Sequence, residues 1–309
     1  MHVEQLVYPL FLENGTGVKR EISSLPGNYR WSLDTVLGEI DSCVQLGLYN
    51  FILFPAVEEA LKDKTGTHSY AEENFYLHMI REIKARFPHV TLISDVALDP
   101  YSSDGHDGIV AGGKILNDET LPVLGKMAVA QAQAGIDIIG PSDMMDGRVG
   151  FIRDELDQQG YTDTGIMSYT AKYASAFYGP FRDALDSAPK ASEDIPADKK
   201  TYQMDPANKV EALREGALDY NEGADFLMVK PALHYMDVIH VMKENFDIPI
   251  AAYHVSGECA MLKAACANGW LVYETAMPET LTALVRAGTD VIITYFAKDF
   301  AELNAKGSL

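Results

Sequence analysis

Two lysines stand where a side-chain amine could act as a nucleophile. Lys230 follows the apolar run 226–229 and precedes Pro231, and Lys172 follows the run 166–169. If these runs are neighbouring parallel strands, the two amines converge at one end of a sheet. Poor hydration and a second nearby cation both lower a lysine pKa, which makes a free amine available to form a Schiff base. A single lysine at a strand end is more often a surface residue, so the pair carries this hypothesis.

Carboxylates gather in the segment 94–108, around the end of a third apolar run. It holds Asp95, Asp99, Asp104 and Asp107, together with a histidine and two glycines. Oxygen ligands suit a hard cation such as Mg²⁺, whereas thiolates are typical of zinc sites. Asp99 and Asp107 are therefore candidate ligands of an active-site cation. A solvated acidic loop is the alternative interpretation.

Side chains that could hold the carboxylates of a substrate occur in two sets. A guanidinium, an ammonium and an amide together form a plausible carboxylate clamp, and hydroxyl groups can form a second polar anchor. The small, polar segment at about 187–203 is where a catalytic lid would lie, although a plain surface insertion would look similar. The first set is Arg182, Lys199 and Gln203, near or within that segment, and the second is Ser256 and Tyr295.

The elements that must position these residues form a repeat of βα units. Apolar runs without strict alternation are typical of parallel strands covered on both faces, and amphipathic stretches lie between them. Several helical stretches end in Gly, which tolerates the left-handed helix C-cap, before the next strand begins. The candidate strands are 6–11, 51–55, 91–98, 136–140, 165–169, 226–229, 250–255 and 291–295, and the clearest helices are 31–46, 74–86, 121–134, 208–221 and 275–287.

Eight such units predict a (β/α)8 barrel, in which catalytic groups lie at the carboxyl ends of the strands. A length of 309 residues suits one barrel with added loops, since a typical barrel needs roughly 250. An open, doubly wound sheet is the alternative. The absence of a Gly-rich phosphate loop after the first strand weakens that alternative.

Composition excludes several classes of function. The net charge of −20 disfavours binding to nucleic acid or to an anionic membrane surface. No apolar run reaches the ~18 residues of a membrane span, and residues 1–12 do not read as a signal peptide. Three cysteines without metal-ligand spacing indicate a reducing compartment, so we expect a cytoplasmic protein.

Several long motifs, in order, resemble those of the porphobilinogen synthases, also called 5-aminolevulinate dehydratases, over nearly the whole chain. The resemblance implies that two molecules of 5-aminolevulinate condense asymmetrically to porphobilinogen with loss of two waters, in tetrapyrrole (heme or chlorophyll) biosynthesis. It implies no organic cofactor. The segments that carry it are 94–108, GPSDMMDGRVGFIR at 140–153, SYTAKYASAFYGPFRDA at 168–184, YQMDPAN at 202–208, MVKPAL at 228–233 and VSGECA at 255–260.

The same resemblance implies a role for each candidate residue. Lys230 would form the Schiff base with the first-bound substrate, and Lys172 would be its companion lysine. Asp95 is a further substrate-binding candidate. One substrate carboxylate would be held by Ser256 and Tyr295, and the other by Arg182, Lys199 and Gln203 from the lid.

Departures from the family pattern concern metal and assembly. Zinc-type members carry three cysteines where this chain has Ala97, Asp99 and Asp107, so the chain resembles the zinc-independent branch that uses Mg²⁺ or a monovalent cation. In that branch the carboxylate corresponding to Glu215 binds an allosteric Mg²⁺ through water. The family forms homo-octamers through an N-terminal arm. Residues 1–5 are expected to be a remnant of that arm, and residues 6–309 the barrel.

Two other functions remain as alternatives from the residues alone. A different Schiff-base barrel enzyme, related to class I aldolases, would share the lysines. Arg182 and Lys199 favour an amino-acid-like carboxylate substrate over a sugar phosphate. A catalytically inactive scaffold or regulatory subunit is disfavoured because both lysines, Ser256 and Tyr295 are all present.

Overall fold

A closed barrel of parallel strands forms the centre of the molecule. The computed structural model describes residues 1–187, 189–190, 192 and 194–307. The barrel strands hydrogen-bond in the order β12-β11-β10-β9-β8-β5-β4-β1, and β1 pairs with β12 to close the ring. The predicted (β/α)8 barrel is confirmed, and the open-sheet alternative is wrong. The barrel strands are β1 (Leu6–Glu13), β4 (Asn50–Ala56), β5 (Thr91–Ile93), β8 (Ile138–Ile139), β9 (Gly165–Lys172), β10 (Phe226–Lys230), β11 (Ile250–His254) and β12 (Val291–Thr294).

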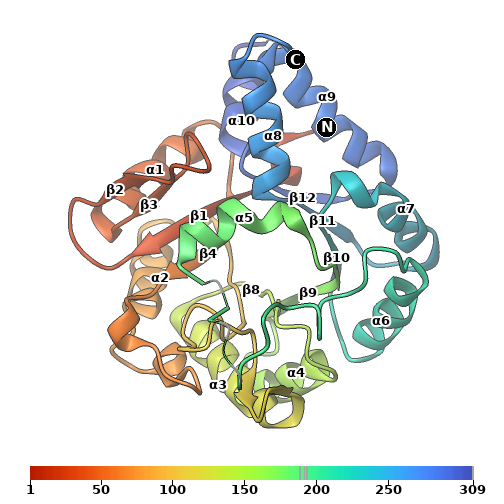
Figure 1. The fold of residues 1–309 in the computed structure, drawn as a ribbon. Helices are drawn as coiled ribbons and strands as arrows, with labels where there is room; N and C mark the ends of the chain where they lie inside the picture. Colours follow the sequence, from red (N-terminus) through yellow and green to blue (C-terminus); the bar gives the residue numbers. More distant parts are fainter. Residues whose placement is uncertain (188, 191, 193, 308–309) are drawn as a thin grey trace.

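Helices surround the strands, and the short α5 crosses in front of the barrel in Figure 1. Within the described part of the chain, no helix has both the length and the apolar character needed to cross a bilayer. The helices are α1 (Leu33–Gln45), α2 (Phe75–Arg86), α3 (Asn117–Ala134), α4 (Arg148–Gln158), α5 (Gly179–Leu185), α6 (Val210–Asn221), α7 (Met236–Asn245), α8 (Ser256–Ala267), α9 (Tyr273–Ala287) and α10 (Ala297–Ala305).

The predicted αβ turns at the ends of helices are present. Gly135 and Gly288 take positive φ angles of 108° and 118° as the C-caps of α3 and α9. An L-residue with a side chain avoids this region, so glycine lets the chain reverse directly into the next strand. The five helices expected from periodicity all form, with ends shifted by a few residues.

Two predicted strands are shorter than expected, and of these 136–140 forms regular strand only over β8. The run 91–98 forms regular strand only over β5, although Ser94 N still donates to Ile138 O and Val96 N to Gly140 O. A Cβ added at Gly140 would lie 2.5 Å from Ser94 O, so the two backbones approach unusually closely here. The ladder continues irregularly, and the chain then turns away into the aspartate-bearing loop.

Two hairpins were not predicted. β2 (Lys19–Glu21) pairs with β3 (Tyr29–Trp31) beside β1, and β6 (Ile109–Ala111) pairs with β7 (Lys114–Leu116) before α3. Ahead of the barrel, Val3–Gln5 forms a short 3-10 helix.

Candidate active site

The register of two neighbouring strands brings the predicted lysines together. β9 and β10 are parallel, and Lys230 pairs with Lys172 at the carboxyl ends of these strands. Both side chains are buried, at 5% and 7% exposure. They line one cavity at the carboxyl end of the barrel, as the two apolar runs predicted.

Aromatic rings enclose the amine of Lys230. Its Nζ lies 4.4 Å from the centre of the Tyr253 ring, 4.9 Å from that of Phe181 and 5.0 Å from that of Tyr169. Burial first, and the charge of Lys172 second, lower the pKa of Lys230 from 10.5 to about 7. The amine is therefore available in its unprotonated, nucleophilic form near neutral pH.

Asp107 lies between two other lysines. Lys172 Nζ donates to Asp107 Oδ2 at 3.1 Å, and Lys199 Nζ donates to Asp107 Oδ1 at 2.5 Å and to Asp99 Oδ2 at 3.1 Å. Burial alone would raise the pKa of Asp107, but Lys172 and Lys199 hold it at about 2. Burial alone would also lower the pKa of Lys199, but Asp107 and Asp99 raise it. This ion-paired cluster joins the segment 194–203, through Lys199, to the acidic loop at 94–108.

Asp95 lines the same cavity and is a second group with a displaced pKa. It is 5% exposed, and burial first, then the nearby Asp99, raise its pKa to about 7. A carboxyl group that exchanges its proton near neutral pH beside a free amine can serve as a proton donor or acceptor.

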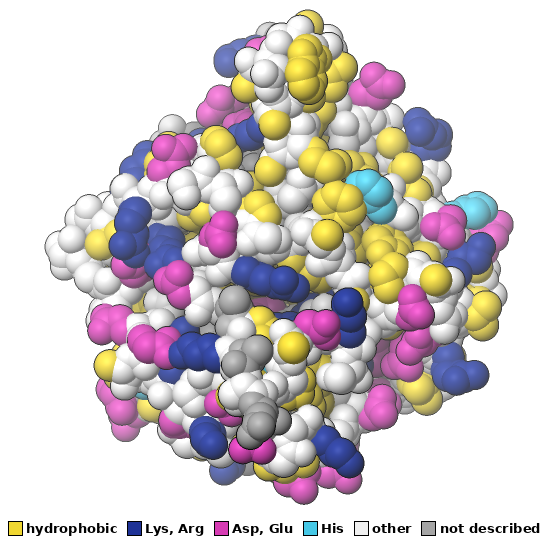
Figure 2. Space-filling model, in the orientation of Figure 1, with side chains coloured by type: hydrophobic (Ala, Val, Ile, Leu, Met, Phe, Trp, Pro, Cys, Tyr) yellow, Lys and Arg dark blue, Asp and Glu magenta, His cyan; other side chains and the backbone are white. Residues whose placement is uncertain are grey.

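The cavity is also lined by the three residues predicted to hold one substrate carboxylate. Arg182, from α5, and Lys199 and Gln203, after it, line the cavity with both catalytic candidates. Figure 2 shows basic side chains near the middle of this face and acidic ones spread around it. The cavity has a volume of about 30 Å³, room for a single water, whereas ligand pockets commonly have roughly 300 Å³ or more. A substrate can therefore enter only if residues that line the cavity move apart.

Ser256 and Tyr295 lie one layer behind the cavity. Ser256 is fully buried at the start of α8, and its Oγ accepts from Phe181 N at 3.0 Å. The Tyr295 hydroxyl lies 3.1 Å from that of Tyr253, the tyrosine nearest to Lys230 Nζ. The pair therefore adjoins the Lys230 side of the site.

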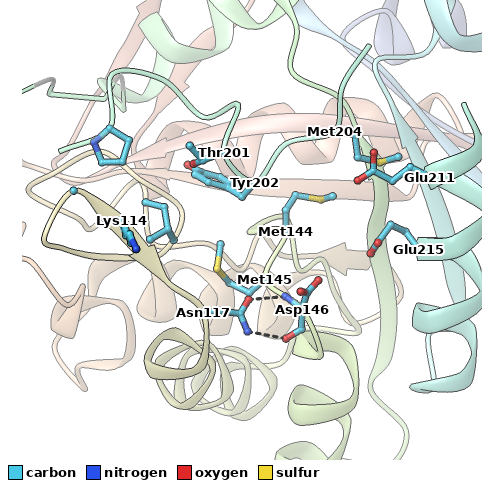
Figure 3. Close-up of a pocket in the computed structure, with 13 residues that line it drawn as sticks. Lys114, Asn117, Met144, Met145, Asp146, Thr201, Tyr202, Met204, Glu211 and Glu215 are labelled. Atoms are coloured by element: carbon cyan, nitrogen blue, oxygen red, sulfur yellow. Dashed lines mark hydrogen bonds between the residues drawn. The ribbon is translucent and has the colours of Figure 1, made fainter. Parts of the chain in front are cut away.

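Glu215 lies apart from the lysines. It lines a separate cavity of about 460 Å³, shown in Figure 3, where it projects from α6 beside Glu211. Across the cavity, Asn117 Nδ2 donates to Asp146 O at 3.1 Å and Asp146 N donates to Asn117 Oδ1 at 2.7 Å. Burial first, and then Asp219, raise the pKa of Glu215.

The two predicted metal sites differ in how well they fit an ion. Among the residues that the structure describes, no three His, Cys, Asp or Glu side chains are grouped as ligands of one ion. The carboxylates of Asp99 and Asp107 already accept from lysine ammonium groups, so the prediction of an active-site cation on this pair does not fit the arrangement. The cavity at Glu215 is large enough for an ion that keeps its water shell.

Several site residues were not predicted. Lys172 also donates to the backbone oxygen of Ser142, and Tyr178, Phe181 and Ser187 line the cavity. The density of aromatic residues in 168–184 was a usable signal, because a lysine that must lose its proton needs an apolar enclosure. No pattern in the sequence pointed to the Ser142 carbonyl.

Comparisons with known proteins assign the chain to a family and agree with its fold. The family profile described as "Delta-aminolevulinic acid dehydratase" matches residues 1–303. The chain is 51% identical over 304 residues to the protein of that name from Chlamydia pneumoniae, covering 98% of this chain and 90% of the relative. It is 47% identical over 302 residues to that from Bacillus subtilis (strain 168), covering 98% and 91%.

A solved structure extends the likeness to three dimensions. It is described as a crystal structure of delta-aminolevulinic acid dehydratase (porphobilinogen synthase) from Toxoplasma gondii ME49 in complex with the reaction product porphobilinogen. The TM-score is 0.95 at 48% identity, over 98% of this chain and 85% of that one. By sequence and by structure, the chain belongs to the delta-aminolevulinic acid dehydratase family.

Proposed function

We propose that this chain is a lyase that condenses two molecules of 5-aminolevulinate to porphobilinogen, with loss of two waters, in tetrapyrrole biosynthesis. The observation that carries the proposal is the pairing of Lys230 with Lys172, which leaves Lys230 with a pKa of about 7 inside an aromatic enclosure. The product named for the Toxoplasma gondii structure supports the same reaction.

In the proposed first step, the unprotonated amine of Lys230 adds to the ketone carbon of one substrate. Loss of the ketone oxygen as water leaves a protonated Schiff base, whose positive charge activates the neighbouring carbon. The oxygen needs protons in order to leave. Lys172 and Asp95 line the same cavity and are the groups placed to deliver them.

The substrate carboxylates are assigned to the two sets of anchors. Ser256 and Tyr295, on the Lys230 side, hold one carboxylate. Arg182, Lys199 and Gln203 hold the other when the lid, at about 187–203, closes. Within this lid, residues 188, 191 and 193 lie outside the described part of the chain.

Asp99 and Asp107 act as counter-ions in this proposal. With the lid segment placed as it is here, they accept from Lys199, and Asp107 also accepts from Lys172. When substrate enters, its carboxylate competes for Lys199, so the ion pairs with Asp99 and Asp107 hold the lid only until they are exchanged.

The proposal also covers the metal, the assembly and the compartment. The family is metal-dependent, and we assign Mg²⁺, bound through water near Glu215, as the metal, with no requirement for zinc. A hydrated Mg²⁺ would supply fixed positive charge at the carboxylates of α6.

We further propose a homo-octamer in the cytoplasm that binds neither nucleic acid nor membrane. The three cysteines, which form no disulfide, are consistent with a reducing compartment.

A colorimetric assay for pyrrole formation from 5-aminolevulinate tests the proposed activity. The purified chain should form a pyrrole, and Lys230→Met should form none above background. Lys298→Met is a matched control, because Lys298 pairs with Glu39 away from the cavity. A chain that forms no pyrrole, or a Lys230→Met variant that keeps its rate, would overturn the proposal.

A further inference from the structure

A buried carboxylate outside the cavity connects the segments that carry the proposed substrate anchors. Glu258 is the third residue of α8, two positions after Ser256, and its residue is 1% exposed. It belongs to the motif at 255–260, but neither the proposed chemistry nor the carboxylate clamp uses it.

Glu258 accepts hydrogen bonds from the loop that directly follows Lys230. Leu233 N donates to Oε1 at 2.8 Å, and Ala232 N lies 3.4 Å from Oε2. Pro231, between Lys230 and Ala232, has no backbone N–H, so these are the first two backbone donors after the Schiff-base lysine.

The same carboxylate binds the start of α8. Val255 N donates to Oε2 at 2.9 Å, which fixes the backbone of the residue just before Ser256. One side chain therefore joins the turn after β10 to the turn after β11. Backbone bonds to a carboxylate are short-range and directional, so they hold the two turns in register.

A third segment joins the cluster through His234. Its Nδ1 lies 3.3 Å from Glu258 Oε1, and its ring stacks on Phe177 with centres 4.2 Å apart. A Cβ added at Gly257 would meet Phe177 O at 2.5 Å, so the backbone before α5 rests directly on the first turn of α8. Phe177 leads into α5, which carries Arg182.

We propose that Glu258 is a positioning residue that sets the separation between the Lys230 amine and the Ser256 hydroxyl. This rests on the roles proposed above for those two residues. Glu258 does not reach the cavity, and it acts through the backbones that it binds. A substrate that is held at its carboxylate by Ser256 presents its ketone to Lys230 only if the two turns keep this spacing.

The test variant is Glu258→Gln, which keeps the shape of the side chain. One acceptor oxygen becomes an NH2 donor that faces backbone N–H groups, so at least one turn loses its attachment. The measured quantity is the 5-aminolevulinate concentration that half-saturates borohydride trapping on Lys230, together with KM and kcat for pyrrole formation. We expect half-saturation and KM to rise about 10-fold or more, because small misplacements of reacting groups have large effects.

Asp290→Asn is the matched control. Asp290 also accepts from a backbone N–H of the same barrel, Ile250 N at 2.8 Å, and pairs with Lys243, but at the opposite end of β11. It should lower the melting temperature while leaving half-saturation unchanged. A purely structural role for Glu258 would give the same pattern.

The outcomes separate the positioning role from the proposed function. If the unmodified chain is not labelled on Lys230, the proposed function fails and the role of Glu258 falls with it. If that chain is labelled and Glu258→Gln half-saturates within about 2-fold of it, the positioning role alone is wrong.

A second variant decides the matter should Glu258→Gln not fold. His234→Phe keeps the stack on Phe177 and removes the bond to Glu258. A rise of about 3-fold in the half-saturating concentration, as expected from the loss of one modest hydrogen bond, supports the positioning role of Glu258. An unchanged value contradicts it.

Discussion

Lys172 should act on Lys230 mainly through its charge, and Lys172→Met tests this. The Nζ atoms of both lysines lie near the Tyr169 ring, 5.0 Å from its centre for Lys230 and 5.9 Å for Lys172. The two amines are therefore at most about 11 Å apart. A unit charge at ~10 Å, with an effective dielectric constant of ~20, contributes ~1.7 kcal/mol, or a little over one pH unit.

Lys172→Met should raise the pKa of Lys230 from about 7 to about 8. The substitution also leaves Asp107 with one cationic partner fewer, and the added negative field changes the pKa of Lys230 in the same direction. At pH 7 the free-amine fraction of Lys230 falls from about one-half to about one-tenth, so Schiff-base formation slows about 5-fold. Above pH 9, where Lys230 is mostly unprotonated in both proteins, this charge effect should no longer separate the Schiff-base formation rate of Lys172→Met from that of the unmodified chain.

The assay is the initial rate of borohydride-trapped incorporation of 5-aminolevulinate, measured from pH 6 to 10. Lys172→Arg is the control, because it retains the charge and should keep the midpoint near that of the unmodified chain. A Lys172→Met midpoint that stays in place or moves down would refute the electrostatic reasoning and leave Lys172 with a role in proton transfer alone.

Three further predictions follow from buried charges and from the metal assignment. The pKa of Lys230 is lower in the folded chain, about 7, than its usual 10.5. The unfolded chain therefore binds more protons between these values, and this residue makes stability rise with pH across that window. Lys230→Met should remove that dependence and raise the free energy of unfolding at pH 7 by about 4 kcal/mol, and a denaturant titration showing no gain would contradict it. Asp107→Asn leaves two buried lysines short of a counter-ion, so it should lower stability by about 3 kcal/mol and speed proteolysis within 194–203. Unchanged cleavage would show that the ion pairs do not hold the lid. Activity should rise with Mg²⁺ and survive zinc chelators, and Glu215→Ala should abolish the Mg²⁺ stimulation while keeping a basal rate and borohydride trapping. Full Mg²⁺ activation of the variant, or loss of activity when bound zinc is removed, would overturn the metal assignment.

The barrel and the lysine pair could be predicted because both follow from local pattern. Apolar runs separated by helices indicate parallel strands, and parallel strands place their carboxyl ends together. Lys230 and Lys172 each end such a run, so their convergence needed only strand order, which the structure confirms.

The contacts of Lys199 could not be predicted in the same way. Lys199 and Asp99 are 100 residues apart, and both lie in loops whose course is set by contacts rather than by periodicity. The acidic loop suggested a cation, and in this structure the ammonium of Lys199 contacts both carboxylates. Charge pattern predicted the sign of the partner and not its identity.

Glu258 shows a second limit. In the sequence it is one acidic residue in the first turn of a helix, where a carboxylate commonly caps the helix. Its bonds to Ala232 N and Leu233 N depend on how two βα turns meet in space. No spacing along the chain encodes that meeting.

The site assignment depends most directly on which residue forms the Schiff base. Borohydride reduction in the presence of 5-aminolevulinate, followed by peptide mapping, identifies that residue. We predict a single adduct on Lys230, absent from Lys230→Met. An adduct on Lys172 or Lys199, with Lys230 unmodified, would contradict the assignment.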